Sequence, residues 1–348
     1  MSSLLNWTRL PPLPDTEGFA GMYAGVSDEA LIVAGGTNFP RAPIWEGGQK
    51  IWHECVFVLD KPNGQWRTAK ETLPRPLAYG ISATWKGTVI CAGGSDSKRH
   101  YSDVFALRLV DGRIQTEPLP PLPRPCADMC GILLGSQLYV AGGTDRPNAT
   151  TGLHTFWTLD LSRPKDSLYW EELEPWPGPE RSHAVAATVG DSFYLISGFR
   201  WKPGHDGAAV PVTPFLVDAY RYSPQTNGKG TWKRIADVPR AVGAAPSPAM
   251  TLNASRIAVI GGIDHTLGDH EPATHPGFPL DVTVYDPSEN SWKWAGKMPN
   301  GNSRVTAPST LWDSGYVVVG GERAPARRSP DLHVARSELD TDRYRSGR

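Results

Sequence analysis

The sequence has no excess of charge of either sign and no long apolar segment. It contains 35 Lys and Arg against 36 Asp and Glu in 348 residues, which leaves a formal net charge of −1 at pH 7. This balance gives no electrostatic reason to expect nucleic acid or an anionic membrane as a partner. No apolar run approaches the ~18 residues of a membrane span, and the N-terminus, MSSLLNWTRLPPLP, has no basic region followed by an apolar stretch. We therefore expect no nucleic-acid partner, no membrane partner and a cytoplasmic location.

Cysteine is also scarce. The four cysteines are Cys55, Cys91, Cys126 and Cys130. Disulfide frameworks belong mainly to small secreted chains, so this number in a long chain favours reduced, buried thiols.

The motifs of several large enzyme classes are absent. The sequence has no GxGxxG, P-loop, GxSxG or HExxH pattern, so dinucleotide, nucleotide and metalloprotease chemistries have no support. His265, His270 and His275 share one long segment, but their spacing matches no standard zinc pattern. We expect a solvated lid or rim there and no metal site.

Glycine (36) and proline (33) are abundant, and the glycines mark a repeat. Short apolar runs that end in a glycine pair or its near-equivalent occur as LIVAGG (31–36), VICAGG (89–94), LYVAGG (138–143), FYLISG (193–198), IAVIGG (257–262) and VVVGG (317–321). A recurrence every ~50–65 residues, with several strands in each unit, is typical of a kelch-type β-propeller. Six copies predict six blades.

Each repeat contains the pattern of four strands. In the first repeat these are FAGMYAGV (19–26), ALIVAGG (30–36), ECVFVLD (54–60) and QWRTAKETLP (65–74). The small residues of the first strand suit a position near the central axis, where large side chains would collide. The fourth strands carry a tryptophan in four of the repeats, at Trp66, Trp170, Trp232 and Trp292.

The two ends of the chain complete each other. The sixth unit (306–337) has three strands, whereas NWTRLPPLP (6–14) has the pattern of a fourth strand with none before it. Pairing of residues 5–11 with 331–337 would close the ring and remove an open sheet edge. The sequence thus predicts an all-β, six-bladed kelch-type propeller over residues 1–338, its last blade closed by the N-terminal strand, with a polar tail at 339–348.

One face of such a propeller is expected to carry the site. The loop after each glycine pair and the link before each first strand should surround the mouth of the central channel, here named the funnel. Five of the six links contain an arginine: Arg75, Arg124, Arg181, Arg240 and Arg304. A guanidinium matches a carboxylate in a bidentate fashion, so this set favours an anionic ligand, although each arginine alone is equally explained as solvating a turn. Asn38 follows the first glycine pair on the same face.

Three segments carry a more specific signal than the glycine pairs: WTRLPPLPDTEGFAGMYAGVSDEALIVAGGTNF, LAYGISATWKGTVICAGG and, in the middle of this chain, VDAYRYSPQTN. In this order they resemble the N-acetylneuraminate epimerases, or sialic acid mutarotases, in a cyclically permuted form. The first is similar to an internal blade of those enzymes, the second to their final blade and the third to a blade near their N-terminus. The similarity extends over nearly the whole chain once the order is rotated.

The resemblance implies a catalytic pair. In the family a glutamate follows one blade's glycine directly, and an arginine lies six residues later. Here VVVGGERAPARRSPDLHV supplies Glu322 and Arg328, with Arg327 adjoining, so either arginine can fill the role. A second family glutamate is replaced by Ser95 and Asp96, and this departure bears on the exact substrate.

The activity implied is the interconversion of the anomers of N-acetylneuraminate or a related small acidic sugar, by acid–base ring opening and without a cofactor. Glu322 would be the base. The residues expected to hold the substrate are Arg75, Arg124, Arg181, Arg304, Asn38 and Arg327 or Arg328. One alternative is a non-catalytic kelch module that binds an acidic peptide or sugar on the funnel face. A copper oxidase of the galactose oxidase type lacks a clear ligand set here, and a sialidase lacks its S-x-D-x-G-x-T-W box.

Overall fold

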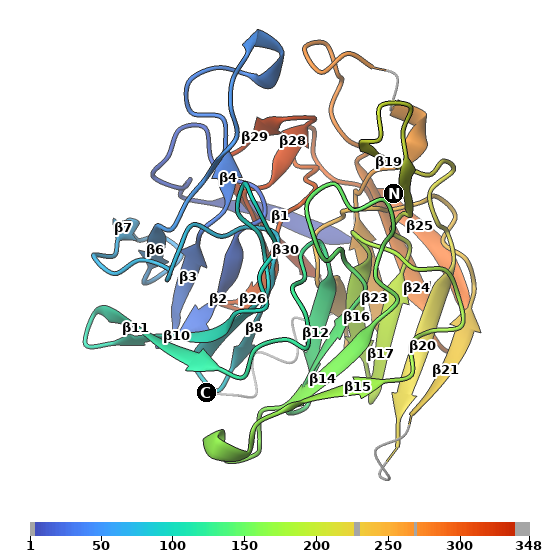
Figure 1. Ribbon diagram of the computed structural model, residues 1–348, viewed down its shortest axis with the longest axis horizontal. Helices are drawn as coiled ribbons and strands as arrows, with labels where there is room; N and C mark the ends of the chain where they lie inside the picture. The colour runs from blue at the N-terminus through green and yellow to red at the C-terminus, as the bar shows by residue number, and fades with distance from the viewer. Residues whose placement is uncertain (1–3, 226–229, 268–269, 338–348) are drawn as a thin grey trace.

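The computed structural model describes residues 4–225, 230–267 and 270–337. Within these ranges six four-stranded antiparallel sheets follow one another around a central axis (Figure 1). This arrangement confirms the predicted six-bladed β-propeller. The tail predicted at 339–348 lies outside the described residues.

Five blades are built from consecutive stretches of chain, each running outward from the axis. The first two are β2–β3–β6–β7 (Tyr23–Ser27, Ala30–Ala34, Val56–Leu59, Arg67–Thr68) and β8–β9–β10–β11 (Ile81–Trp85, Thr88–Ala92, Val104–Val110, Arg113–Leu119). The next three are β12–β13–β14–β15 (Cys130–Leu134, Gln137–Ala141, Phe156–Asp160, Trp170–Leu173), β16–β17–β20–β21 (Val185–Val189, Ser192–Ile196, Ala219–Pro224, Gly230–Ile235) and β22–β23–β24–β25 (Met250–Leu252, Arg256–Ile260, Asp281–Asp286, Ser291–Lys297).

The sixth blade joins the two ends of the chain, as predicted. Its strands run from the axis outward as β26 (Ser309–Trp312), β27 (Gly315–Val319), β30 (Leu332–Ser337) and β1 (Leu5–Leu10). The N-terminal strand β1 pairs antiparallel with β30, from Leu5 opposite Ser337 to Leu10 opposite Leu332. In Figure 1 the blue β1 accordingly lies beside the red β30.

The tryptophans of the fourth strands tie neighbouring blades together. Each indole Nε1 donates a hydrogen bond to the carbonyl of the residue that follows the outermost strand of the preceding blade. The pairs are Trp66 to Pro11, Trp170 to Pro120, Trp232 to Glu174 and Trp292 to Ala236, all at 2.8–2.9 Å. A buried indole N–H needs such an acceptor, and the repeat supplies it at the same place each time.

A second set of contacts joins the blades at the axis. Each link places one residue in a left-handed conformation, with φ between 50° and 69°. The amide of each such residue donates to the carbonyl of the equivalent residue of the preceding blade at 2.7–2.9 Å. The amide of the first blade's residue donates to the carbonyl of the sixth blade's residue, so the six bonds form a closed circle. These six positions, named the ring residues, are Gly21, Tyr79, Asp128, His183, Ala244 and Thr306.

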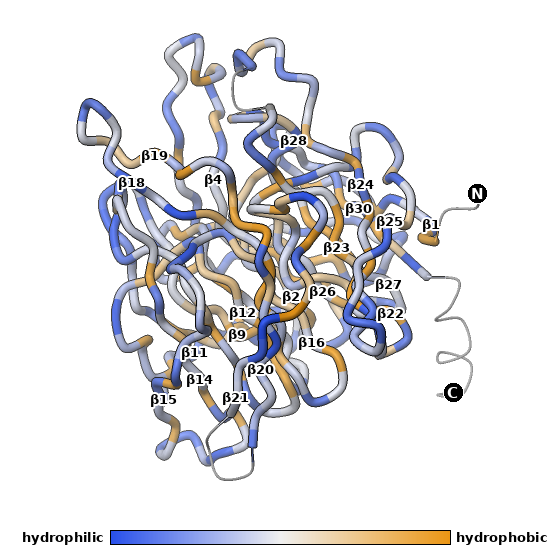
Figure 2. The backbone as a smooth tube through the Cα atoms, turned by 90° about the vertical axis from the view of Figure 1, so that its right-hand side faces the viewer, coloured by the Kyte–Doolittle hydropathy of each residue, from blue (hydrophilic) through white to orange (hydrophobic). Residues whose placement is uncertain are grey.

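Two-stranded ribbons rise beside the ring. They are β4–β5 (Thr37–Asn38, Ile51–Trp52), β18–β19 (Trp201–Pro203, Ala209–Pro211) and β28–β29 (Glu322–Ala324, Arg327–Arg328). Figure 2 shows β4, β18, β19 and β28 toward the same end of the molecule. Three short 3₁₀ turns complete the secondary structure of the described residues: η1 (Ile44–Glu46), η2 (Lys165–Ser167) and η3 (His265–Leu267).

The cysteines are free thiols, and three of them are buried. Burial raises the pKa of Cys130 to about 12 and that of the half-buried Cys55 to about 11. The described part of the chain contains no helix that is long and apolar enough to cross a membrane.

Closure of the last blade can be tested with Leu5, which β1 buries among residues of the fifth and sixth blades. We expect Leu5→Ala to lower the free energy of unfolding by about 2–5 kcal/mol, because a buried leucine leaves a cavity. The matched control Arg9→Ala, on the exposed side of the same strand, should change it by less than about 0.5 kcal/mol. Urea unfolding measures both. Equal, small effects would contradict the docking of β1 on the sixth blade.

Candidate active site

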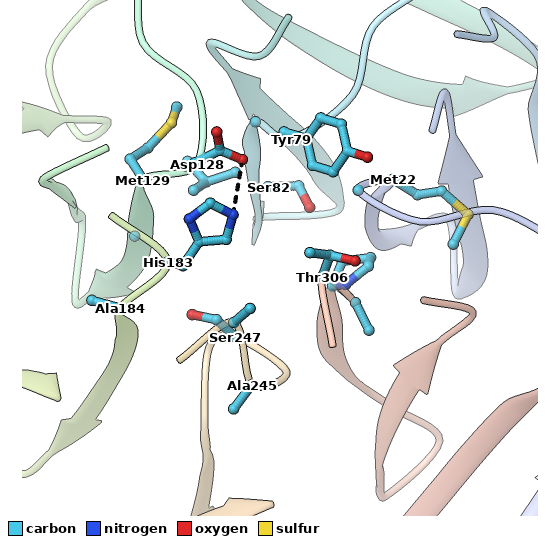
Figure 3. Close-up of a pocket in the computed structure, with 17 residues that line it drawn as sticks. Met22, Tyr79, Ser82, Asp128, Met129, His183, Ala184, Ala245, Ser247 and Thr306 are labelled. Atoms are coloured by element: carbon cyan, nitrogen blue, oxygen red, sulfur yellow. Dashed lines mark ion pairs between the residues drawn. The ribbon is translucent and has the colours of Figure 1, made fainter. Parts of the chain in front are cut away.

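The ribbons and the loops after the second strands enclose an open cavity at the funnel. Its volume is about 490 Å³. The side chains that line it include Tyr79, Asp128, His183 and Thr306 from the ring, together with Glu322. The same four ring residues also line a narrower space of about 80 Å³ (Figure 3). The ring residues therefore divide a wide outer cavity from a narrow inner one.

Glu322 is held at the cavity by a short hairpin. In the β28–β29 ribbon Glu322 lies opposite Arg328, and Arg328 Nη1 is 2.8 Å from Glu322 Oε2. The amide of Ala326 also donates to Oε2 at 3.0 Å, and Thr306 Oγ1 lies 3.3 Å from Oε1. Both carboxylate oxygens thus have fixed partners, while 16% of the side chain stays exposed.

The two neighbouring arginines have different surroundings. Arg328 is 3% exposed; its Nε donates to Thr37 O at 3.2 Å, and its Nη2 lies 3.4 Å from Tyr79 Oη. Arg327 instead lies over the Trp45 ring, 5.0 Å from its centroid. Arg328 is therefore the arginine that pairs with Glu322. Its guanidinium is occupied by protein groups and presents no free charge to the cavity.

His183 and Asp128 form a second pair at the cavity. His183 Nε2 lies 3.3 Å from Asp128 Oδ1, as the dashed line in Figure 3 marks. On its other side Nδ1 lies 2.9 Å from Ser182 Oγ, which accepts a hydrogen bond from Trp201 Nε1 at 2.8 Å. The imidazole also stacks on Phe199, with ring centroids 4.7 Å apart.

This hydrogen-bond order assigns the tautomer of the neutral imidazole. A carboxylate can only accept, so Nε2 of the neutral ring donates toward Asp128, and Nδ1 accepts from the Ser182 hydroxyl, whose lone pairs remain able to accept from Trp201. The ring proton then resides on Nε2, the nitrogen that lies beside Asp128. The pair places an exchangeable proton at the wall of the cavity.

The expectation that the link arginines face the funnel is wrong for Arg181 and Arg304. Both lie two residues before a ring residue, and both side chains are buried. Arg181 Nη2 donates to Asp218 Oδ2 at 2.7 Å, and Arg304 Nη2 donates to Asp331 Oδ2 at 3.1 Å. The reason is that a guanidinium at this position points between strands, where an aspartate just before the third strand neutralises it.

The Arg304 cluster is further constrained by burial. Arg304 Nη2 lies 3.1 Å from His333 Nε2. Burial lowers the pKa of Arg304 to about 10, and burial together with the Arg304 charge lowers the pKa of His333 to about 4. These groups form a structural core of the sixth blade and are not accessible to a ligand.

The other three link arginines, of which Arg75 and Arg124 were expected to bind substrate, also lie off the cavity wall. Arg75 pairs with Asp103 at 3.2 Å, Arg240 pairs with Asp264 at 3.4 Å, and Arg124 is exposed. None of the three is among the residues that line the 490 Å³ cavity.

Asn38 is fully buried, so it does not fill the expected place either. Its Oδ1 lies 2.7 Å from His53 Nε2, and its amide nitrogen donates to Asp15 Oδ1 at 3.3 Å. Asn38 therefore braces the base of the β4–β5 ribbon.

Sequence reasoning missed the ring residues. They occupy one equivalent position in each link, so an alignment of the links around the first strands is the signal that would find Tyr79, Asp128, His183 and Thr306. Their left-handed backbone has no signature in the sequence, because only Gly21 of the six is a glycine.

A metal site finds no support in the described residues. No group of three or more His, Cys, Asp or Glu side chains there is placed to hold an ion. In the histidine-bearing segment the ring centroids of His270 and His275 lie 5.7 Å apart.

A further histidine, His100, lies at the cavity wall. Burial lowers its pKa, and its Nε2 lies 3.0 Å from Thr144 Oγ1.

The corrected role of the buried arginines leads to a stability prediction. We expect Arg181→Ala to lower the free energy of unfolding by about 3–5 kcal/mol, because it leaves Asp218 buried and unpaired. Arg124→Ala, in the equivalent link of another blade but exposed, should change it by less than about 0.5 kcal/mol. Chemical denaturation measures both values. A stable Arg181→Ala protein with weakened binding of an acidic sugar would restore the funnel-facing role.

Comparisons with known proteins agree with this architecture. A family model described as N-acetylneuraminate epimerase matches residues 2–115 and 119–273. The N-acetylneuraminate epimerase of Pasteurella multocida (strain Pm70) is 28% identical over 241 residues, which cover 62% of this chain and 58% of the relative. That of Haemophilus influenzae (strain PittEE) is 29% identical over 252 residues, covering 66% and 62%. The chain thus spans about three fifths of the length of these curated relatives.

A solved structure, that of YjhT, has the same fold. It superposes with a TM-score of 0.70 over 94% of this chain and 97% of its own, at 16% sequence identity. An identity this low supports the fold alone, whereas the family model matches well over half of the sequence. The chain belongs to the N-acetylneuraminate epimerase family.

Proposed function

We propose that this protein interconverts the anomers of N-acetylneuraminate or a closely related sugar acid. The observation that carries the proposal is the presence of a fixed carboxylate, Glu322, and an imidazole, His183, on one open cavity. Anomer interconversion needs a proton acceptor and a proton donor at the same sugar carbon. The name of the curated relatives supports the choice of sugar.

The reaction starts with ring opening. Glu322 accepts the proton of the anomeric hydroxyl, while a donor protonates the ring oxygen as the bond between that oxygen and the anomeric carbon breaks. The open-chain ketone then turns its carbonyl to present the other face. Return of both protons along the same routes closes the ring as the other anomer, so no atom or electron is gained or lost.

The protein groups divide these tasks. Arg328 acts as a positioning residue, since its ion pair with Glu322 at 2.8 Å fixes where the carboxylate lies. His183 with Asp128 is the proposed donor to the ring oxygen: as imidazolium it gives up the Nε2 proton at the cavity wall and becomes neutral, and the adjacent Asp128 carboxylate stabilises the charged form. The proposed base and the proposed donor lie on opposite sides of the ring of six residues. Thr306 contacts Glu322, and Asp128 is three positions away from Thr306 along that ring.

The alternative of a binding module for acidic peptides loses its main argument. It relied on arginines lining the funnel, and the two most strongly held of them, Arg181 and Arg304, are buried ion-pair partners. The cytoplasmic location remains a prediction, as do the absences of nucleic-acid and membrane partners.

Glu322→Gln tests the proposed base. The amide keeps the size of the side chain but cannot accept the proton, so we expect the enzyme-catalysed exchange to fall by about 10²–10⁴-fold. Two-dimensional exchange NMR of α- and β-N-acetylneuraminate measures the rate directly. Glu180→Gln, which removes a carboxylate that pairs with Arg200 outside the cavity, is the matched control and should keep the wild-type rate. Equal acceleration by wild type and Glu322→Gln would refute the assignment.

His183→Gln tests the proposed donor. Glutamine retains a polar side chain but cannot relay a proton, so we expect kcat to fall by about 10²-fold with little change in KM. The control His154→Gln changes an exposed histidine that contacts the Trp176 carbonyl away from the cavity. The same NMR exchange assay serves both variants, and an unchanged kcat in His183→Gln would remove the imidazole from the mechanism.

A further inference from the structure

We propose that Lys50 binds the substrate carboxylate and makes the site selective for sugar acids over neutral sugars. The inference rests on the proposed function and assigns the cation that the link arginines do not provide. Lys50 immediately precedes β5 in the β4–β5 ribbon and lines the same cavity as Glu322.

Aromatic rings place the Lys50 ammonium at the cavity wall. Nζ lies 5.2 Å from the centroid of the Trp52 ring and 5.3 Å from that of the Tyr79 ring. It is also 3.5 Å from Tyr79 Oη. Cation–π attraction of this kind positions a positive charge without neutralising it.

The charge of Lys50 is available to a ligand. Arg146, another cation of the cavity wall, pairs with Asp145 at 3.0 Å, and Arg328 pairs with Glu322. Lys50, by contrast, makes no ion pair with any carboxylate in the described ranges 4–225, 230–267 and 270–337. A ligand carboxylate therefore meets an ammonium that has no internal counter-charge to displace.

The acidic groups of the wall are already occupied. Asp96 accepts a hydrogen bond from Tyr101 Oη at 2.5 Å and others from the Lys98 and Arg99 amides. Asp128 lies against His183, and Glu322 against Arg328. These partners limit the repulsion that an incoming carboxylate would otherwise meet.

The position of Lys50 also matches the chemistry of the substrate class. In a 2-keto sugar acid the carboxylate and the anomeric hydroxyl are attached to the same carbon, so the cation and the base must lie close together. A continuous series of contacts joins them: Lys50 Nζ to Tyr79 Oη at 3.5 Å, Tyr79 Oη to Arg328 Nη2 at 3.4 Å, and Arg328 Nη1 to Glu322 Oε2 at 2.8 Å. A neutral aldose carries hydrogen in place of the carboxylate and gives Lys50 nothing to bind.

The test combines a change in the protein with a change in the sugar. N-acetylneuraminate and its methyl ester are compared as substrates of wild type and Lys50→Gln, with kcat/KM from NMR exchange and Kd from titration of tryptophan fluorescence. We expect the kcat/KM of wild type to be about 10–100-fold higher for the acid than for the ester, which corresponds to the free energy of one hydrogen bond to a charged group. Lys50→Gln should treat the two sugars alike, and Lys50→Arg should restore most of the preference.

The matched control is Lys86→Gln. Lys86 also lies over a tryptophan ring, 4.9 Å from the centroid of Trp85, but in the β8–β9 turn, away from the cavity. It should keep the wild-type preference for the acid. A Lys50→Gln protein that still discriminates between acid and ester as wild type does would overturn the inference, even if turnover is normal. If wild type does not catalyse exchange, the proposed function fails, and the Kd values alone then decide on Lys50; absence of binding by wild type would refute Lys50 as well.

Discussion

A closed circle of six backbone hydrogen bonds at the axis is the constraint on which the rest of this structure depends. Each link must supply one residue whose amide reaches the carbonyl of the preceding blade, and this requires a left-handed backbone at Gly21 and at five residues that are not glycine. Such a conformation costs roughly 1–2 kcal/mol for each ordinary residue. The circle offsets the cost by joining all six blades at once. It also turns the ring side chains toward the funnel, so the contact that holds the blades together presents Tyr79, Asp128, His183 and Thr306 to the site.

The N-terminal strand β1 completes the sheet of the sixth blade, whose link supplies Thr306 to the circle. Pairing of β1 with β30 covers the outer edge of that blade and buries Leu5 against its neighbours. The β28–β29 ribbon, with Glu322 and Arg328, extends from the same blade. The position of the proposed base therefore depends on a strand that is more than 300 residues away in the sequence.

The charged side chains fall into two groups, one buried between the strands of the blades and one at the wall of the cavity. Arginines that point between strands find an aspartate of their own blade and serve stability, as Arg181 and Arg304 do with Asp218 and Asp331. A buried guanidinium without such a partner would be strongly unfavourable. The cavity wall instead carries short paired units, Glu322 with Arg328 and Asp128 with His183, and the ammonium of Lys50, which makes no ion pair within the part of the chain that the structure describes. The proposed chemistry uses charges at the wall, whereas most of the arginines conspicuous in the sequence stabilise the scaffold.

The sequence by itself determined the number of blades, their strands and the closure by the N-terminal strand, because these features depend on local patterns: glycine-ended runs and alternating apolar residues. The resemblance to a family of enzymes indicated Glu322 and left the choice between Arg327 and Arg328 open. Only the tertiary structure decided that Arg328 and not Arg327 faces Glu322, that Arg181 and Arg304 are buried, and that His183 meets Asp128 at the cavity. The physical reason is that a side chain's direction depends on backbone angles and on neighbours from other blades. Arg181 and Arg304 lie two residues before a ring residue and are buried beside an aspartate, whereas Arg124 lies four residues before one and is exposed. The residue type, arginine in each case, does not show this difference in burial.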